Sequence, residues 1–314
     1  MALIDQVGLT GPEYEVCIEQ GKIREFARAM DAPLAEFVSG PNTIIPPTFP
    51  VCLPYTWGYT LERPRGTVFA EVEHDLAVSL HAEESFVFHG APPRAGDKLI
   101  AQPKLEKVWE KQGGSGGKLT FLTILNEYRG PDGALRIEQR STSVTTETTP
   151  GEGDWKPQVP DYDPDYHDLE RPTPFSGIER QEFSELQENK SPGTIAAAPL
   201  LKQEIVRFQG VVGEDDPLHH DGEWAQKNGY PSVFALGTHQ ASLMAAYASY
   251  WLSPESIRSF TVRFREVMWP GDLLVYNGIV TQLDIDAKTV TLHLTCKRTD
   301  ETLVSEAWAT YDFS

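Results

Sequence analysis

The sequence has few cysteines, no long apolar run and a shortage of basic residues. Its three cysteines, Cys17, Cys52 and Cys296, are odd in number and far apart. They predict reduced thiols rather than a disulfide framework or a cysteine-based zinc site. No run of about 18 or more apolar residues is present, so no membrane span is expected. The first residues, MALIDQVGLTGPEYEV, lack the basic start and apolar core of a signal peptide, which predicts a cytoplasmic protein.

The shortage of basic residues limits the partners. The chain has 27 Lys and Arg against 46 Asp and Glu, a formal net charge of −19. Such a field repels nucleic acids and anionic membranes, so neither is an expected partner. An anionic ligand such as coenzyme A would need a local basic patch. With 314 residues, 40% of them hydrophobic, the chain can bury two ordinary cores or one large one.

An internal repeat organises the sequence. Ser85–Leu99 (SFVFHGAPPRAGDKL) is similar to the stretch that starts at Phe260 (FTVRFREVMWPGDLL), and the Gly-Asp pair after each turn coincides. Alternating apolar residues predict four strands in each copy: Leu80–Gly90, Leu99–Trp109, Leu119–Arg129 and Leu135–Glu147, then Ile257–Glu266, Leu273–Leu283, Thr289–Arg298 and Leu303–Phe313. The pattern predicts an α+β fold with an internal duplication.

Between the copies the composition changes. Residues from Thr148 to Gly193 are rich in Pro, Asp, Glu and Tyr and show little apolar periodicity, which is typical of a linker. A structureless connection of this length is unusual inside one compact domain. The predicted division is an N-terminal unit at 1–147, an acidic Pro-rich linker at 148–193 and a C-terminal unit at 194–314.

The most informative stretch is Val211–Tyr250. Its first part is a polar loop that contains Glu214, Asp216 and His219, and its second part, Gly237–Trp251, is rich in Ala, Leu and Met. The second part predicts a helix that is buried on most sides. A helix start offers free N–H groups and a positive dipole end, so an acid–imidazole loop leading into it predicts an active site.

This loop resembles the signature of a known family. Gly213–Asp221 (GEDDPLHHD) is similar to the Gly-Asp-x-Asn-Pro-Leu-His-x-Asp motif of the MaoC-like, (R)-specific enoyl-CoA hydratases. Glu214 stands where that family has its catalytic Asp, and Asp216 stands where it has Asn. The resemblance implies a double hotdog, with two antiparallel sheets each wrapped around a central helix. It also implies a coenzyme A thioester as the substrate and no cofactor.

The resemblance further implies site residues. The catalytic groups would be Glu214 and His219, which hold one water, and the N–H of Gly237, which faces the thioester oxygen. Substrate contacts are expected from Asp216, Leu236 and Thr238. Apart from the resemblance, Arg263 and Arg265 are two residues apart on a predicted strand and share one face, which makes them candidates for binding the pantetheine phosphates of the substrate, although a solvated face is an open alternative. In the first copy the corresponding loop is APLAE, and Ala35 stands at the His219 position. The N-terminal hotdog would therefore lack the catalytic His, which predicts one active site per chain. The activity that the resemblance implies is that of a hydratase or dehydratase (a hydro-lyase).

Several alternatives stay open from the sequence. His219 could be a structural histidine, and Asp216 could fix the loop through backbone bonds. A metal site at His219, His220, Asp221 and His239 matches no helical His-Glu-x-x-His spacing, so no metal is expected. The substrate could be bound to an acyl-carrier protein or be a dicarboxylyl thioester such as mesaconyl-CoA. The chain could also be a non-catalytic acyl-thioester-binding hotdog protein, and a homodimer is possible.

Overall fold

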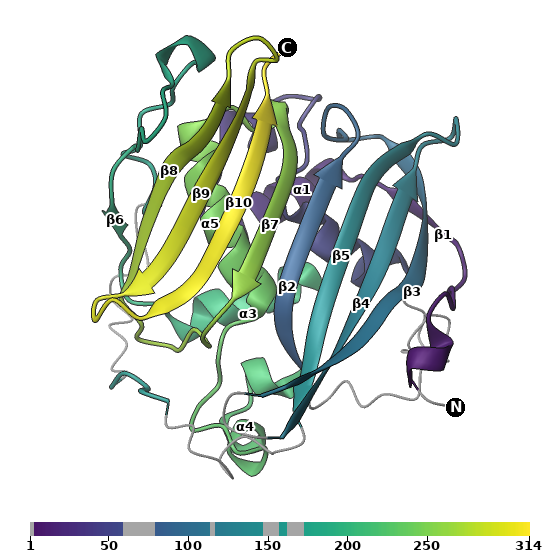
Figure 1. The fold of residues 1–314 in the computed structure, drawn as a ribbon, viewed down its shortest axis with the longest axis vertical. Helices are drawn as coiled ribbons and strands as arrows, with labels where there is room; N and C mark the ends of the chain where they lie inside the picture. Colours follow the sequence, from purple (N-terminus) through teal and green to yellow (C-terminus); the bar gives the residue numbers. More distant parts are fainter. Residues whose placement is uncertain (1–2, 59–78, 114–116, 147–156, 162–172) are drawn as a thin grey trace.

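One antiparallel sheet dominates the computed structural model, which describes residues 3–58, 79–113, 117–146, 157–161 and 173–314. Within these residues ten strands run in the order β1-β3-β4-β5-β2-β7-β10-β9-β8-β6 (Figure 1). The first-half strands are β1 (Tyr14–Cys17), β2 (Ser79–Phe88), β3 (Lys98–Gln112), β4 (Lys118–Arg129) and β5 (Leu135–Thr146). The second-half strands are β6 (Ile195–Ala196), β7 (Ile257–Phe264), β8 (Leu274–Asp284), β9 (Thr289–Arg298) and β10 (Leu303–Asp312). The expected antiparallel meanders are confirmed.

The two halves join through a direct strand pair at the centre of the sheet. β2 pairs antiparallel with β7, and Phe86 lies opposite Phe260. Both side chains are fully buried. The same register places Glu83 opposite Arg263, and their side chains form an ion pair of 2.7 Å across the junction. The two copies are therefore one continuous sheet and not two separate layers.

The repeated Gly-Asp pair forms the same turn in both halves. The Asp97 carboxylate accepts a hydrogen bond of 2.8 Å from the Arg94 amide, and the Asp272 carboxylate accepts one of 2.8 Å from the Trp269 amide. The glycine before each aspartate has a positive φ, +93° and +87°, a conformation that favours glycine. The sequence repeat thus reflects a structural repeat at this turn.

The second half has a long central helix, and the described part of the corresponding first-half region is a shorter helical stretch. Helix α5 (Gly237–Trp251) is almost entirely buried against one face of the sheet, as its composition predicts (Figure 1). In the first half, the sequence after the prolines of PPTFP predicts a helix near Val51–Tyr59, and the described part of this stretch is helical but irregular. It is a 3₁₀ helix at Phe49–Cys52 and a π-helix at Pro54–Gly58, joined by Leu53. The change of geometry comes at Pro54, which lacks the N–H group that a regular helix uses. Tyr59 lies outside the described residues.

Two further helices precede the Pro-Leu loops. Helix α1 (Gln20–Ala29) and helix α3 (Lys202–Val212) pack together, with the rings of Phe26 and Phe208 5.6 Å apart. The sequence of Leu201–Gly210 predicts a strand or a strand that leads into a helix, but the stretch is helical almost throughout. The short helices α2 (Ala35–Val38) and α4 (Gly222–Lys227) follow α1 and α3 respectively.

Part of the predicted linker packs on the second half. Residues 147–156 and 162–172 lie outside the description, but Phe175 is fully buried. Its ring makes edge contacts with Tyr247 at 5.8 Å and Tyr276 at 5.1 Å. The end of this segment therefore contributes to the C-terminal core, although the three-part domain division stays a prediction. Among the described helices, none has the length and apolar character needed to cross a bilayer.

Candidate active site

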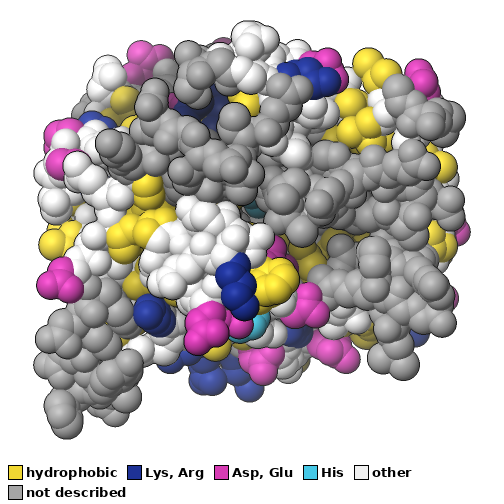
Figure 2. All heavy atoms as spheres, turned by 90° about the horizontal axis from the view of Figure 1, so that it is seen from below, with side chains coloured by type: hydrophobic (Ala, Val, Ile, Leu, Met, Phe, Trp, Pro, Cys, Tyr) yellow, Lys and Arg dark blue, Asp and Glu magenta, His cyan; other side chains and the backbone are white. Residues whose placement is uncertain are grey.

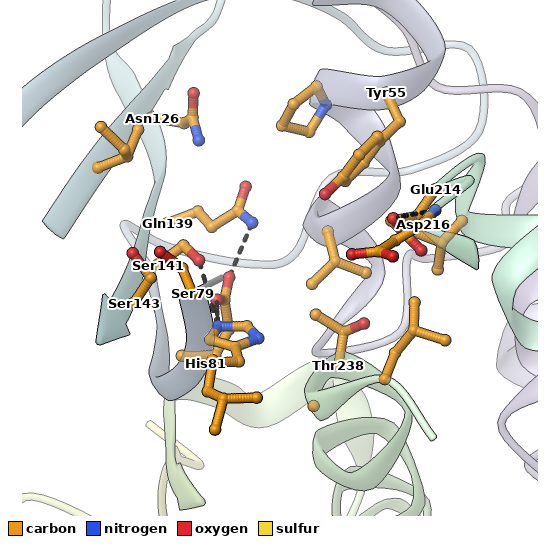
Figure 3. Close-up of a pocket in the computed structure, with 18 of the residues that line it drawn as sticks. Tyr55, Ser79, His81, Asn126, Gln139, Ser141, Ser143, Glu214, Asp216 and Thr238 are labelled. Atoms are coloured by element: carbon orange, nitrogen blue, oxygen red, sulfur yellow. Dashed lines mark hydrogen bonds and ion pairs between the residues drawn. The ribbon is translucent and has the colours of Figure 1, made fainter. Parts of the chain in front are cut away.

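A pocket of about 490 Å³ lies between the two halves of the chain, a size typical of small-molecule sites. Its two walls face each other in Figure 3. One wall comes from the first-half strands β2, β4 and β5. The other comes from Tyr55, the loop after α3 and the start of α5. Glu214, Asp216, His219, Leu236, Gly237 and Thr238 all line this pocket, so most of the residues singled out in the sequence are brought together.

His219 is held in one orientation by the backbone. Its Nδ1 lies 2.8 Å from the carbonyl oxygen of Phe234, and the two rings make an edge contact at 5.0 Å. Because a carbonyl can only accept a hydrogen bond, Nδ1 carries the proton. Nε2 is then the lone-pair nitrogen of the neutral ring. His219 thus offers the pocket a group that can accept a proton from water.

The carboxylates of Glu214 and Asp216 have different surroundings. Glu214 accepts hydrogen bonds from the Asp216 amide at 2.6 Å and from the side-chain amide of Gln209 at 3.0 Å. Asp216 accepts one from the Leu218 amide at 2.9 Å and caps the 3₁₀ turn at Pro217–His219. Asp216 therefore fixes the loop through backbone bonds. Among the described residues, no direct hydrogen bond joins Glu214 to His219, so a bound molecule would have to bridge them.

The start of α5 closes the pocket on one side. Gly237 is the first residue of the helix, and its N–H is one of the amides that have no partner inside the helix. A Cβ added at Gly237 would lie 2.9 Å from both Cβ and Nδ1 of His81. Glycine is therefore required at position 237 because the His81 side chain approaches so closely, and not because of its backbone angles. Leu236 and Thr238, on either side, also line the pocket.

The first-half wall carries a hydrogen-bonded network that faces the loop. His81 Nε2 lies 2.7 Å from the Glu84 carboxylate and 3.2 Å from the Ser141 hydroxyl. Glu84, which is fully buried, also accepts a bond of 2.8 Å from the Gln139 amide. Tyr128 in turn donates to the Gln139 oxygen at 3.0 Å. Figure 3 shows the second ring nitrogen of His81 directed across the cavity toward Thr238.

Arg263 and Arg265 do not join this site. Arg263 is about half exposed, pairs with Glu83 at 2.7 Å and lies over the Trp308 ring at 5.2 Å. Arg265 is similarly exposed and pairs with Glu306 at 2.5 Å. Arg263 lies on β7, on the face opposite to that of Val262, which is buried in the core. Arg265 lies one residue past the end of β7, and neither arginine lines the pocket. Figure 2 likewise shows basic side chains lying next to acidic ones on the face seen from below.

The remaining polar residues of the stretch have structural partners. Asp221 caps α4 by accepting from the amides of Glu223 and Trp224. His220 contacts the Gln209 oxygen at 2.9 Å. His239 is buried and stacks on Phe208 at 4.5 Å. Its burial, and to a smaller degree the charge of His219, lower the pKa of His239 to about 3. No cluster of three metal-ligating side chains is found within the described ranges.

The pocket residues that were not found from the sequence include His81, Glu84, Asn126 and Gln139. The sequence placed His81 on a strand but gave it no partner. The signal that could have revealed them is polar side chains at the core-facing positions of strands β2, β4 and β5, where apolar residues are expected. Glu84, Asn126 and Gln139 are each at most 6% exposed, and buried polar groups of this kind often mark a site.

The joined sheet and the buried helix are the features of a double-hotdog fold, and the acid–imidazole loop lies in the pocket between its halves. Comparison with protein families agrees with this fold. Residues 5–138 match the FAS1-like dehydratase domain region, and residues 184–301 match the MaoC-like domain. The first half of the chain is thus similar to one dehydratase-type region and the second half to another.

Known relatives support the same placement. The enoyl-CoA hydratase ChsH3 of Mycobacterium tuberculosis is 23% identical over 222 residues, which cover 70% of this chain and 67% of that protein. A solved structure described as a MaoC-like dehydratase superposes with a TM-score of 0.77 at 22% identity, with all of both chains covered. A second Mycobacterium tuberculosis protein, described as a double hotdog, gives a TM-score of 0.59 at 12% identity, covering 98% of this chain and 96% of that one. The predicted fold class is confirmed.

Proposed function

We propose that the protein is a hydro-lyase that adds water across the 2,3-double bond of an enoyl-CoA thioester, or removes it from the 3-hydroxyacyl thioester. The match of residues 184–301 to the MaoC-like domain and the similarity to an enoyl-CoA hydratase support hydratase or dehydratase chemistry on acyl thioesters. The observation that carries the proposal is the placement of His219 and Glu214 in one pocket with the start of α5.

The proposed roles follow from the hydrogen bonds. Because Phe234 holds the His219 proton on Nδ1, Nε2 can accept a proton from a bound water. Glu214, whose carboxylate is oriented by the Asp216 amide and Gln209, can hold the same water from its other side. Water oxygen would then bond to C3, and a water proton would pass to this acid–base pair. The pair would return a proton to C2, and dehydration would follow the reverse path.

The thioester oxygen needs a hydrogen-bond donor while negative charge develops on it. The Gly237 amide at the N-terminus of α5 can serve as this donor, because a preorganised N–H in a water-poor site stabilises an oxyanion strongly. Leu236 and Thr238 would contact the substrate on either side of this amide, and Asp216 would keep the loop in shape. No cofactor is expected, because coenzyme A takes part only as the thioester portion of the substrate.

A neighbouring pair of acids permits a controlled test. Glu214→Gln removes the proposed acid, and Asp215→Asn changes the next acid, which is exposed and does not line the pocket. Hydration of crotonyl-CoA would be followed for the wild type and both variants. We expect a loss of about 10²-fold or more in kcat for Glu214→Gln and a change within a few-fold for Asp215→Asn.

The outcomes separate the candidate functions. A wild-type protein that binds acyl-CoA but hydrates no enoyl thioester of any chain length would be a binding protein and not an enzyme. A wild type that acts only on carrier-protein thioesters would be a dehydratase of carrier-bound chains. Equal activity of the wild type and Glu214→Gln would remove Glu214 from the mechanism. The expected homodimer and the cytoplasmic location stay predictions.

A further inference from the structure

The first-half wall of the pocket contains an amide that faces the cavity and has no hydrogen-bond partner among the described residues. Asn126 lies on β4, is 6% exposed and lines the pocket. Within the described part of the chain, no group forms a hydrogen bond with its side chain. The Ser143 hydroxyl, on the neighbouring strand β5, is also buried and unpaired among those residues. Native proteins rarely leave buried polar groups unpaired, so this wall is suited to a ligand that supplies the missing partner.

A second amide, that of Gln139, lies next to Asn126 on the pocket-facing side of the sheet. Asn126 lies directly opposite Gln139 in the sheet register, and both residues line the pocket. Gln139 uses its oxygen to accept from Tyr128 and one N–H to donate to Glu84. One N–H of Gln139 is therefore available to a ligand, as are the oxygen and the two N–H donors of Asn126. This pair of amides can bind an oxygen that accepts hydrogen bonds, donates one, or does both.

The charges around the pocket favour a neutral ligand group. The described lining residues include the carboxylates of Glu84, Glu214 and Asp216 but no Lys or Arg. A carboxylate on the acyl chain would therefore be repelled and unpaired there. Pro103, Leu122 and Ile124 also line the pocket beside the amides. These surroundings suit an apolar carbon chain that carries an isolated hydroxyl or carbonyl group.

The Asn126 amide lies beyond the residues that approach the start of α5. His81, which is in close contact with Gly237, bonds the Glu84 carboxylate, and Glu84 in turn bonds the Gln139 amide. Asn126 lies opposite Gln139 on β4, which is one strand further from β2. An oxygen bound by Asn126 would therefore belong to a part of the acyl chain farther from the thioester than the reacting carbons.

We propose that Asn126, assisted by Gln139, binds a hydroxyl or carbonyl oxygen on the distal part of the acyl chain, so that the preferred substrate is an oxygenated acyl thioester. This inference rests on the proposed function, because it assigns the acyl end of the same pocket. The saturated chain of an ordinary fatty-acyl thioester would leave the Asn126 amide buried and unpaired. An oxygenated chain restores its hydrogen bonds and is selected for that reason.

The test uses pairs of 2-enoyl-CoA thioesters of equal length, with and without a hydroxyl at the distal end, over a series of lengths. The wild type should prefer the hydroxylated member at one length by on the order of tenfold in kcat/KM, the value of one to two net hydrogen bonds. Asn126→Leu, which has a similar shape, should lose this preference. Thr123→Val is the matched control, because Thr123 is buried on the same strand but its hydroxyl pairs with Thr142 at 2.8 Å and it does not line the pocket.

The outcomes distinguish this inference from the proposed function. Hydration of both members at equal rates at every length would overturn the inference and leave the hydratase activity standing. A hydroxyl preference that persists in Asn126→Leu would remove Asn126 from the subsite. The ratio of kcat/KM for the hydroxylated and plain thioesters in the wild type tests the substrate preference without any variant. The test therefore holds even if Asn126→Leu folds poorly. A wild type that hydrates neither member would instead contradict the proposed function.

Discussion

The contact between Gly237 and His81 gives a prediction that can be worked out from the structure. In Gly237→Ala the new Cβ would lie 2.9 Å from Cβ and Nδ1 of His81 and 3.1 Å from its Cγ. The His81 ring cannot turn away freely, because it is held by Glu84 at 2.7 Å and packs on Phe264 with ring centroids 4.8 Å apart. Moreover, Cβ of His81 is fixed to the backbone of β2. The start of α5 or the strand must therefore shift.

The expected size of the effect follows from known overpacking costs. Inserting one carbon into a tight contact costs about 1–3 kcal/mol, and for a chain of this size each kcal/mol lowers Tm by roughly 2 °C. Gly237→Ala should therefore lower Tm by about 2–6 °C, although Gly→Ala in a helix is otherwise neutral or favourable. Because the shift moves the amide proposed to bind the thioester oxygen, kcat should fall by about 10²-fold or more.

A second helix start supplies the control. Gly222 is the first residue of α4, and a Cβ added there meets nothing within 4 Å. Gly222→Ala should be at least as stable as the wild type and keep activity within a few-fold. In a His81→Ala background two of the three close atoms are absent, so Gly237→Ala should lower Tm by less there than it does in the wild type. Equal Tm values for Gly237→Ala and Gly222→Ala, or the same Tm loss from Gly237→Ala in both backgrounds, would refute this steric explanation.

Two other predictions concern residues outside the proposed chemistry. The neutral form of His239 is favoured in the folded state, where its pKa is about 3, while in the unfolded chain a histidine titrates near 6.5. The unfolded state therefore binds the proton first, so this residue makes stability fall as pH drops below about 6.5, by about 2 kcal/mol between pH 7 and pH 5. Urea denaturation of His239→Gln should show a shallower pH dependence than the wild type, and an unchanged slope would contradict the assignment. Separately, Arg263→Ala and Arg265→Ala should each keep KM for a coenzyme A thioester within a few-fold of the wild-type value. Both guanidinium groups pair with carboxylates outside the pocket. A rise of tenfold or more in KM would show that they bind the substrate.

Much of the fold follows from local sequence patterns. The strands after Leu80 and Ile257 alternate apolar and polar residues, and each matches a strand in the sheet to within one or two residues at most ends. The helix at Gly237–Trp251 is observed with the expected bounds. Such elements are predictable because each of them buries a face that the sequence marks directly. Ser85–Leu99 and its counterpart share the Gly-Asp turn for the same local reason.

Features that depend on contacts between distant segments were harder to predict. The interior of α3 was ambiguous because a short amphipathic stretch fits a strand or a helix. Arg263 and Arg265 looked available for phosphate binding, but their partners Glu83 and Glu306 are far away in the sequence. The place of His81 at the pocket depends on its contact with Gly237, which is more than 150 residues later in the sequence. A single sequence does not specify such pairings.

The central claim is that His219 acts on the water that adds to the enoyl thioester. The most direct measurement compares kcat/KM for crotonyl-CoA hydration in His219→Gln and His220→Gln, two neighbouring histidines of which only His219 lines the pocket. We predict a loss of about 10³-fold for His219→Gln and a change within a few-fold for His220→Gln. Equal rates for the two variants and the wild type would contradict the claim.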